Sequence, residues 1–235
     1  MELRQFNYYL PLERIAQEPA TPRDSARLMV VDRKTRRISH RHIYDLPDIL
    51  NSTDVLVLNQ TKVIPARIYA YKSTGGKVEL LLIKELSPGI WQTLINPARN
   101  LRPGMNLTFP QNQINAEINS IAFDKEKISC TETYINKTFT LHFKPADAVK
   151  PLIAKAGQMP LPPYIKKPLL HPEYYQTIYA KFAGSIAAPT AGLHFTEKIF
   201  TGLAQKKIDT YFLTLHVGLG TFRPIRVEQI ELHRI

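Results

Sequence analysis

Residues 66–84 read Ala66-Arg-Ile-Tyr-Ala-Tyr-Lys-Ser-Thr-Gly-Gly-Lys-Val-Glu-Leu-Leu-Leu-Ile-Lys84. Two short strand-like runs flank the pair Gly75-Gly76, which is typical of antiparallel strands joined by a glycine turn. Further short runs follow, with no amphipathic helix of useful length between them. The predicted strands are Ala66–Lys72, Lys77–Lys84, Ile90–Ile95, Met105–Phe109, Ile114–Phe123, Lys127–Tyr134 and Thr138–Phe143. Seven short strands with regular turns predict a small antiparallel barrel or sandwich.

The segments on either side of this strand-rich module mix helical and extended patterns. The pattern before the module predicts a hairpin over residues 28–42 and a fully buried strand over Asp54–Asn59. The pattern after it predicts a helix over Thr196–Lys207, capped by Thr196, and a final strand over Ile208–Val217. The strand-rich module is therefore expected to be inserted between two parts of one α/β (α+β) domain.

The chain is strongly basic, with 31 Lys and Arg against 20 Asp and Glu and a formal charge of +11. Such an excess attracts polyanions such as nucleic acids, although it is also compatible with a charge that only maintains solubility. One cluster comprises Arg33, Lys34, Arg36, Arg37 and Arg41, and a second comprises Lys166 and Lys167.

A single cysteine, Cys130, excludes an internal disulfide and a multi-cysteine metal site. The N-terminal residues lack the apolar core of a signal peptide, and no run approaches the roughly 20 apolar residues of a membrane span. We therefore expect a cytoplasmic protein without a membrane partner. His40 and His42 alternate on a predicted strand, which favours a solvated face over a metal site.

Two glycine-containing segments carry histidines. Ala187-Ala-Pro-Thr-Ala-Gly-Leu-His-Phe195 surrounds Thr190 and His194 with small residues ahead of the predicted helix, where a ligand can approach the backbone. Leu215-His-Val-Gly-Leu-Gly-Thr-Phe222 places His216 at the end of a predicted strand, where α/β proteins bind ligands. Each segment taken alone favours a packed turn that holds a hydrogen-bonded core histidine over a ligand site.

Read together, long motifs resemble one family over essentially the whole chain. They are Pro22-Arg-Asp-Ser-Ala-Arg-Leu28, His40-Arg-His42, Asn59-Gln-Thr-Lys-Val-Ile-Pro-Ala-Arg67, Gly75-Gly-Lys-Val-Glu79, Met159-Pro-Leu-Pro-Pro-Tyr-Ile165, Tyr175-Gln-Thr-Ile-Tyr-Ala180, Gly184-Ser-Ile-Ala-Ala-Pro-Thr-Ala-Gly-Leu-His-Phe195 and Thr214-Leu-His-Val-Gly-Leu-Gly-Thr-Phe-Arg-Pro-Ile225. This set resembles the S-adenosylmethionine:tRNA ribosyltransferase-isomerases of queuosine biosynthesis.

The resemblance implies a discontinuous α/β catalytic domain, residues 1–66 and 147–235, with an inserted antiparallel β-barrel domain, residues 67–146. It implies transfer and isomerisation of the ribosyl group of S-adenosylmethionine onto 7-aminomethyl-7-deazaguanine (preQ1) at the tRNA wobble position. The products are epoxyqueuosine, adenine and methionine. S-adenosylmethionine is then a consumed substrate, no metal or other cofactor is implied, and a monomer is expected. Relatives continue into a further segment with Gly-Thr-Thr-x-x-Arg and Thr-Asn-x-His-Leu-Pro runs, so a shortened chain is expected, and its activity alone is open.

Within that chemistry, a base near neutral pKa suits removal of a C5′ proton acidified by the sulfonium, and a second group can assist adenine departure. The candidates are His216 and His194 in either order, with Thr190 and Gly192 holding ribose or carboxylate. We expect Thr190, His194 and His216 to converge on one pocket. The other predicted substrate contacts are Gly218, Gly220, Arg23 and Arg67, the two arginines being equally plausible as structural partners.

Two other function classes remain open. A non-catalytic tRNA- or RNA-binding protein would use the inserted barrel to engage nucleic acid. A methyltransferase-like use of S-adenosylmethionine is less favoured, because no glycine-rich strand-to-helix loop with a following acidic residue is present.

Overall fold

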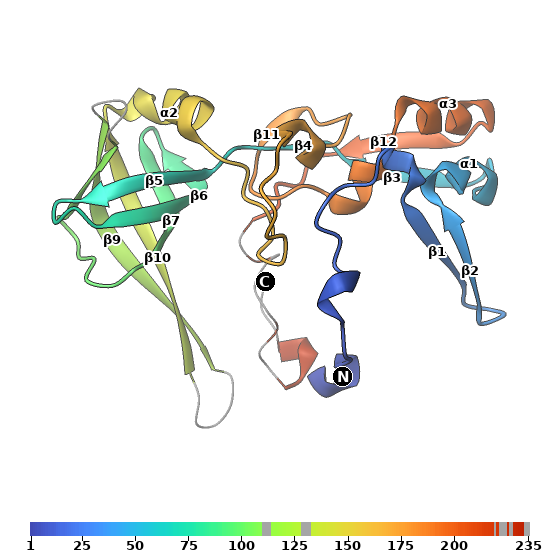
Figure 1. The fold of residues 1–235 in the computed structure, drawn as a ribbon, viewed down its shortest axis with the longest axis horizontal. Coiled ribbons are helices and arrows are strands. Elements are labelled where there is room, and N and C mark those ends of the chain that lie inside the picture. Colours follow the sequence, from blue (N-terminus) through green and yellow to red (C-terminus); the bar gives the residue numbers. More distant parts are fainter. Residues whose placement is uncertain (110–113, 128–132, 219, 221–224, 226–227, 233–235) are drawn as a thin grey trace. The chain divides into compact units, whose positions relative to one another are not determined.

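The computed structural model describes residues 1–109, 114–127, 133–218, 220, 225 and 228–232 (Figure 1). Its contacts divide the chain into two units. The barrel unit comprises Met1–Leu12, Ile64–Pro162 and Gly218–Ile235, and the α/β unit comprises Glu13–Val63 and Pro163–Val217. Each unit is described separately below. No helix in the described residues is both long and apolar enough to cross a membrane.

The barrel unit contains a closed antiparallel barrel with the strand order β10-β7-β6-β5-β8-β9. Its strands are β5 (Arg67–Lys72), β6 (Lys77–Ser87), β7 (Ile90–Asn96), β8 (Asn106–Phe109), β9 (Ile114–Lys127) and β10 (Thr133–Lys144). Alternate residues point inward, as in β6, where Val78, Leu80 and Leu82 are buried. Each large apolar side chain buried in this way contributes about 1.5–3 kcal/mol, so the barrel interior is the core of the unit.

Closure of the barrel confirms the predicted inserted β-barrel, while the strand count differs. The predicted strands Ile114–Phe123, Lys127–Tyr134 and Thr138–Phe143 correspond to two longer strands, β9 and β10, in the described residues. Residues 128–132 of the middle prediction lie outside the described residues. The sequence suggested a break at residues 135–137, but these residues of β10 pair without interruption with residues 123–125 of β9, and the register shift lies further on, between Thr140 and Leu141.

The turn between β6 and β7 depends on Gly89. Gly89 has φ +74°, and a Cβ there would lie 2.6 Å from the Cα of Ala146, so only glycine fits. Beyond the barrel, helix α2 (Val149–Ala156) buries Val149, Leu152 and Ile153.

The α/β unit is built from three two-stranded sheets. The hairpin of β1 (Arg27–Asp32) and β2 (Arg37–His42) is antiparallel, as predicted. The pairs β3 (Val55–Asn59) with β12 (Asp209–Leu213) and β4 (Thr61–Val63) with β11 (Phe182–Ser185) are parallel. The α-helices are α1 (Leu46–Ile49) and α3 (Glu197–Gln205). The fold is therefore an α/β unit whose two chain segments are separated by a closed β-barrel.

Short 3-10 helices connect these elements. In the described residues they are η1 (Leu3–Phe6), η2 (Leu12–Arg14), η3 (Arg23–Ser25), η4 (Ile43–Asp45), η5 (Ala146–Ala148), η6 (Pro172–Tyr175), η7 (Thr190–His194) and η9 (Ile230–Leu232).

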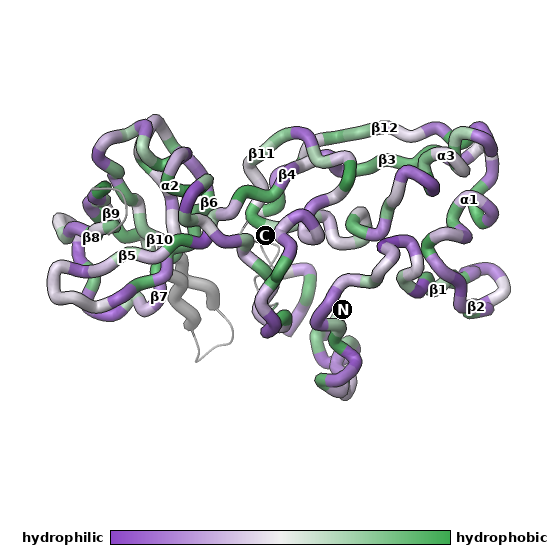
Figure 2. The backbone as a smooth tube through the Cα atoms, turned by 45° about the horizontal axis from the view of Figure 1, so that its top comes forward, coloured by the Kyte–Doolittle hydropathy of each residue, from purple (hydrophilic) through white to green (hydrophobic). Residues whose placement is uncertain are grey.

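The core of the α/β unit lies between α3 and the β3–β12 pair. Its buried residues are Leu58, Phe195, Ile199, Leu203 and Ile208. Figure 2 shows that β3 is largely hydrophobic along its length, whereas β12 changes from polar at its start to hydrophobic at its end. The prediction that the strand at 54–59 is fully buried was wrong, because Val55 and Val57 are more than half exposed. Helix α3 covers one face of the pair, and the described residues leave the opposite face exposed.

Two further predictions in this unit need correction. The helix is shorter than 196–207, and the Thr196 hydroxyl does not cap it but donates to Asp24 Oδ2 at 3.0 Å. The last predicted strand ends at Leu213 rather than at 217, so His216 lies beyond the paired residues.

Candidate functional site

His216 lies three residues after the end of β12 and contacts two other strands. Its Nδ1 is 2.7 Å from the hydroxyl Oγ1 of Thr61, the first residue of β4. Thr61 is fully buried, whereas the His216 side chain is exposed. Gly184 of β11 has φ +150°, and a Cβ on it would lie 2.8 Å from Nε2 and 2.9 Å from Cε1 of His216. One side of the imidazole is thus held by a buried hydroxyl and a glycine backbone.

Polar side chains hold the backbone on both sides of His216. The Asn59 amide donates to the Leu215 carbonyl at 2.9 Å and accepts from the Leu215 N–H at 3.1 Å. On the other side, the Val217 N–H donates to Ser185 Oγ at 3.0 Å. These bonds replace strand pairing for residues that follow β12, so the His216 backbone is preorganised without being part of a sheet.

Thr190 and His194 are the first and last residues of η7. Thr190 is exposed and His194 is half-buried. Gly192 between them is buried, and a Cβ there would lie 2.1 Å from the Tyr179 hydroxyl oxygen. In the structure, the group that approaches this glycine is therefore the protein's own phenol.

Tyr179 joins η7 to the apolar core. Its ring packs against Phe195, Phe200 and Phe212, with centroid separations of 6.1, 5.8 and 5.6 Å. Burial raises the pKa of Tyr179 to about 12. The phenol consequently stays protonated near pH 7.

Arg23 links η3 to the backbone that leads into η7. Its Nη1 donates to the carbonyls of Gln176 and Leu193 at 2.7 and 3.1 Å, and its Nη2 donates to the Glu173 carbonyl at 2.8 Å. The guanidinium also lies over the Tyr174 ring, 5.3 Å from its centroid. The planar fork of donors suits this role, which places Arg23 among the residues that position the backbone of His194.

A basic surface lies on the β1–β2 hairpin. Arg33, Lys34, Arg36, Arg37 and Arg41 are all exposed, and none forms an ion pair within the part of the chain that the structure describes. The turn is closed by Asp32, whose Oδ1 accepts the N–H groups of Lys34 and Thr35 at 2.8 and 3.1 Å. Hydrogen bonds from Thr35 and then Lys34 lower the pKa of the Asp32 carboxyl. We name these five cations the hairpin cluster.

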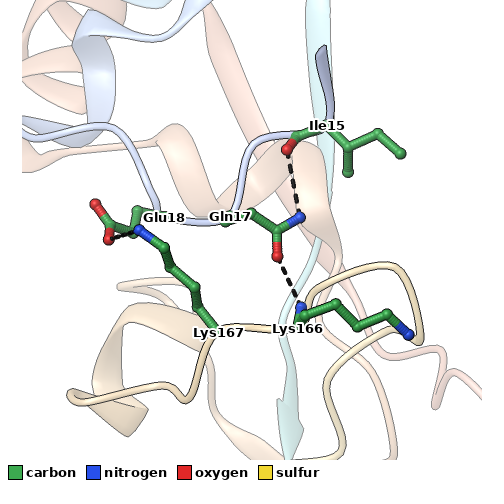
Figure 3. Close-up of polar contacts among 5 residues, drawn as sticks. All are labelled: Ile15, Gln17, Glu18, Lys166 and Lys167. Atoms are coloured by element: carbon green, nitrogen blue, oxygen red, sulfur yellow. Dashed lines mark hydrogen bonds and ion pairs between the residues drawn. The ribbon is translucent and has the colours of Figure 1, made fainter. Parts of the chain in front are cut away.

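The second predicted basic cluster, Lys166 and Lys167, contacts residues near the start of the chain (Figure 3). Lys167 Nζ lies 2.7 Å from Glu18 Oε1, so its charge is paired, although both groups are exposed. The Lys166 N–H donates to Gln17 Oε1 at 2.7 Å, and the Gln17 amide donates to the Ile15 carbonyl at 3.3 Å. These contacts join two segments of the α/β unit, and the pair adds less unpaired charge than its sequence suggests.

His40 and His42 do not form part of a metal centre in the described residues. His40 is exposed, and His42 Nδ1 lies 2.9 Å from the Tyr44 hydroxyl, against which its ring stacks. No group of three or more His, Cys, Asp or Glu side chains is arranged around a possible metal position in the described ranges. The expectation of a reaction without a metal stays a prediction.

A family model described as "Queuosine biosynthesis protein" matches residues 3–235. The chain belongs to this family. A member from Clostridium kluyveri, named S-adenosylmethionine:tRNA ribosyltransferase-isomerase, is 45% identical over 234 residues, which cover 99% of this chain and 65% of the relative. A protein of the same name from Thermotoga maritima is 45% identical over 237 residues, with 100% and 65% covered. The chain therefore spans about two thirds, 65%, of the length of these curated relatives.

One solved structure is also similar to this chain in sequence. It is the S-adenosylmethionine tRNA ribosyltransferase of Thermotoga maritima, 34% identical, with 91% of this chain and 58% of that chain covered and a TM-score of 0.36.

Membership of the queuosine biosynthesis family places both histidine segments inside matched sequence, yet two of the contact residues were not predicted. Thr61 and Gly184 belong to motifs that carry the family resemblance, but their sequence gave no sign of a contact with His216. Tyr179 was likewise missed, although it stands in the quoted Tyr175–Ala180 motif. A bulky residue that covers a buried glycine has no local sequence signature.

The structure brings together only part of the predicted site. Thr190, Gly192 and His194 share η7, and His216 is held by Thr61 and Gly184, but no hydrogen bond in the described residues joins the two histidines. Arg67 belongs to the barrel unit, where its Nε lies 3.4 Å from Glu79 Oε1. Gly218 and Gly220 are assigned to that unit as well. Convergence of these residues on one substrate stays a prediction for this family member.

Proposed function

We propose that the protein transfers and isomerises the ribosyl group of S-adenosylmethionine onto preQ1 at the anticodon wobble position of tRNA. The products are epoxyqueuosine, adenine and methionine. The observation that carries this proposal is the 45% identity, over 99–100% of the chain, with relatives named S-adenosylmethionine:tRNA ribosyltransferase-isomerase. S-adenosylmethionine is consumed as a substrate without a resident cofactor or metal, and the protein acts as a cytoplasmic monomer.

The chemistry needs one proton acceptor and one group that assists a leaving base. The sulfonium withdraws electrons from C5′, so a base can remove a C5′ proton there. Ribose rearrangement then breaks the bond to adenine, whose departure is easier when a donor hydrogen bonds to its ring nitrogens. The preQ1 amine is the nucleophile, and methionine leaves with the sulfur. His194 and His216 supply the two roles, and the exposed Thr190 hydroxyl at the start of η7 binds ribose or carboxylate.

Domain organisation follows from the same assignment. We infer that residues 1–66 and 147–235 form the catalytic domain and that residues 67–146 form the inserted barrel. Gly192, Gly218 and Gly220 let the substrate approach the backbone, and Arg67 binds a phosphate or carboxylate of the substrates.

The test measures free adenine after the protein is incubated with S-adenosylmethionine and preQ1-containing tRNA. Adenine release that depends on both substrates is the expected result, and His216→Ala is expected to lower it by roughly 10²–10⁴-fold with the fold unchanged. Formation of S-adenosylhomocysteine would instead identify methyl transfer. Binding of tRNA without either product would identify the non-catalytic RNA-binding alternative.

The hairpin cluster is the proposed tRNA contact, because its cations are exposed and unpaired in the described residues. The double reversal Arg36→Glu/Arg37→Glu is expected to weaken binding of a tRNA anticodon stem-loop and to reduce its dependence on salt concentration. A matched reversal on the barrel, Lys77→Glu/Lys84→Glu, changes the net charge equally at two exposed positions. If the barrel variant loses more affinity for the stem-loop than the hairpin variant does, the tRNA contact lies on the barrel and the proposal for the hairpin cluster is wrong.

A further inference from the structure

We propose that Thr61 is a positioning residue that holds neutral His216 as the tautomer with its proton on Nε2, so that His216 acts as a hydrogen-bond donor to S-adenosylmethionine. This inference rests on the proposed function for the identity of the ligand. The tautomer itself follows from contacts within the α/β unit.

The first step is the direction of the bond between Thr61 and His216. A threonine hydroxyl has one proton to donate, and a buried donor without an acceptor costs about 1–3 kcal/mol. Thr61 has 0% exposure, so water cannot take this proton. In the described residues, His216 Nδ1, 2.7 Å away, is the acceptor that the structure offers to the hydroxyl. Thr61 therefore donates to Nδ1, and the proton of the neutral ring resides on Nε2.

The second step is the place of Gly184 against the ring. A Cβ on this glycine would lie 2.8, 2.9 and 3.0 Å from Nε2, Cε1 and Cδ2. Three nearly equal distances put Gly184 over the flat face of the imidazole, because an atom in the ring plane ahead of Nε2 would be much closer to Nε2 than to the two carbons. The in-plane direction of the Nε2–H bond is therefore not blocked by Gly184, and the ring is exposed.

The consequence is a division of roles between the two histidines. A neutral imidazole that carries its proton on Nε2 presents a donor there and has no lone pair to accept a C5′ proton at that atom. His216 therefore hydrogen bonds to an acceptor of S-adenosylmethionine, either an adenine ring nitrogen or the carboxylate. Removal of the C5′ proton falls to His194, the other histidine of the proposed site.

The decisive experiment is nitrogen NMR of the protein with ¹⁵N-labelled histidine, at a pH where His216 is neutral and without substrate. Its resonances are assigned with His216→Gln. The expected wild-type spectrum has an unprotonated Nδ1 and a protonated Nε2, unchanged in Thr61→Ser, whereas Thr61→Val gives an average of both tautomers. A protonated Nδ1 in the wild type would overturn the inference, as would a Thr61→Val spectrum identical to the wild type. The wild-type measurement stands even where a variant fails to fold.

Two additions connect the tautomer to the ligand. Adenosine and methionine are titrated separately, and the one that shifts the Nε2–H resonance identifies the acceptor as the adenine ring or the carboxylate. No shift with either, or with S-adenosylmethionine itself, would overturn the donor role. Thr61→Val is expected to lower kcat/KM for adenine release roughly tenfold, the loss of one hydrogen bond, with rescue by Thr61→Ser. Absence of adenine release from the wild type would refute the proposed function but leave the tautomer result intact.

Discussion

Replacement of Gly192 by alanine perturbs the contact between η7 and the aromatic core. The new Cβ would lie 2.1 Å from the Tyr179 hydroxyl oxygen and 3.2 Å from its Cζ. No pair of atoms tolerates the shorter distance, so the Tyr179 ring must move away from Phe195, Phe200 and Phe212. Overpacking of this kind costs about 1–3 kcal/mol, and we expect Gly192→Ala to lower the free energy of unfolding of the α/β unit by that amount.

A second substitution tests whether the hydroxyl is the cause. Tyr179→Phe removes the colliding oxygen, which has no hydrogen-bond partner in the described residues, so alone it should cost less than about 1 kcal/mol. In the double variant the Cβ still meets Thr177 Cγ2 at 3.0 Å and the ring carbon Cζ at 3.2 Å, contacts that shifts of a few tenths of an ångström relieve, so most of the loss should be recovered. The expected coupling free energy is about 1–2 kcal/mol in favour of the double variant.

Hydrogen exchange read by mass spectrometry measures this locally. Peptides that cover α3 and β12 report on the α/β unit, and peptides that cover β6 and β7 serve as the internal control from the barrel. The reasoning is refuted if Gly192→Ala leaves hydrogen exchange of α3 unchanged, or if the effects of the two substitutions on the free energy of unfolding are additive.

Three further perturbations test other contacts. Because burial raises the pKa of Tyr179 from 10.0 to about 12, the unfolded chain loses its phenolic proton first. Stability from this group is therefore complete below about pH 10 and falls as the pH rises toward 12, and urea unfolding of Tyr179→Phe should lack that fall. Arg23→Lys loses a forked donor to three carbonyls and should destabilise the α/β unit by about 1–3 kcal/mol in the same unfolding assay, whereas an unchanged midpoint would contradict the positioning role. Gly89→Ala combines φ +74° with a 2.6 Å clash against Ala146, so the barrel should unfold at lower urea concentration, read by fluorescence of Trp91, the single tryptophan of the chain.

The barrel could be predicted because its signals are local. The alternation of apolar and polar residues and the glycine turns at 75–76 and 89 involve residues close in sequence, and together they predict antiparallel hairpins. The lengths of β9 and β10 could not be predicted, since residues 123–125 and 135–137 are extended because they pair with one another, and cross-strand pairing is not visible in the local sequence. The run at 54–59 predicted a strand correctly, but an apolar run does not reveal whether one face or both are covered.

The sequence predicted the two histidine-containing segments of the candidate site but not the residues that contact them. His194 and His216 stand in unusual glycine-containing segments, so the sequence alone singles them out. Their partners could not be found in this way, because Thr61 and His216 are 155 positions apart and the contact arises only when β12 pairs with β3, which brings Leu213 beside Asn59. Arg23 illustrates the converse, because the sequence left a substrate contact and a structural role equally open, and the structure shows hydrogen bonds from Arg23 to three backbone carbonyls.

The two chain segments of the α/β unit are separated by the barrel sequence, so during synthesis the first segment is exposed before the second has been made. Gln60 bonds to Thr214, which is 154 positions later in the chain. At about 5–20 residues/s, a ribosome needs roughly 8–30 s to supply that partner. The contiguous barrel segment is complete before then and can fold first, whereas Val55, Leu56 and Val57 must wait without β12 beside them. The nascent chain is thus most exposed to aggregation and to chaperone capture through its first sixty residues, and slowed elongation past the barrel would lengthen that interval.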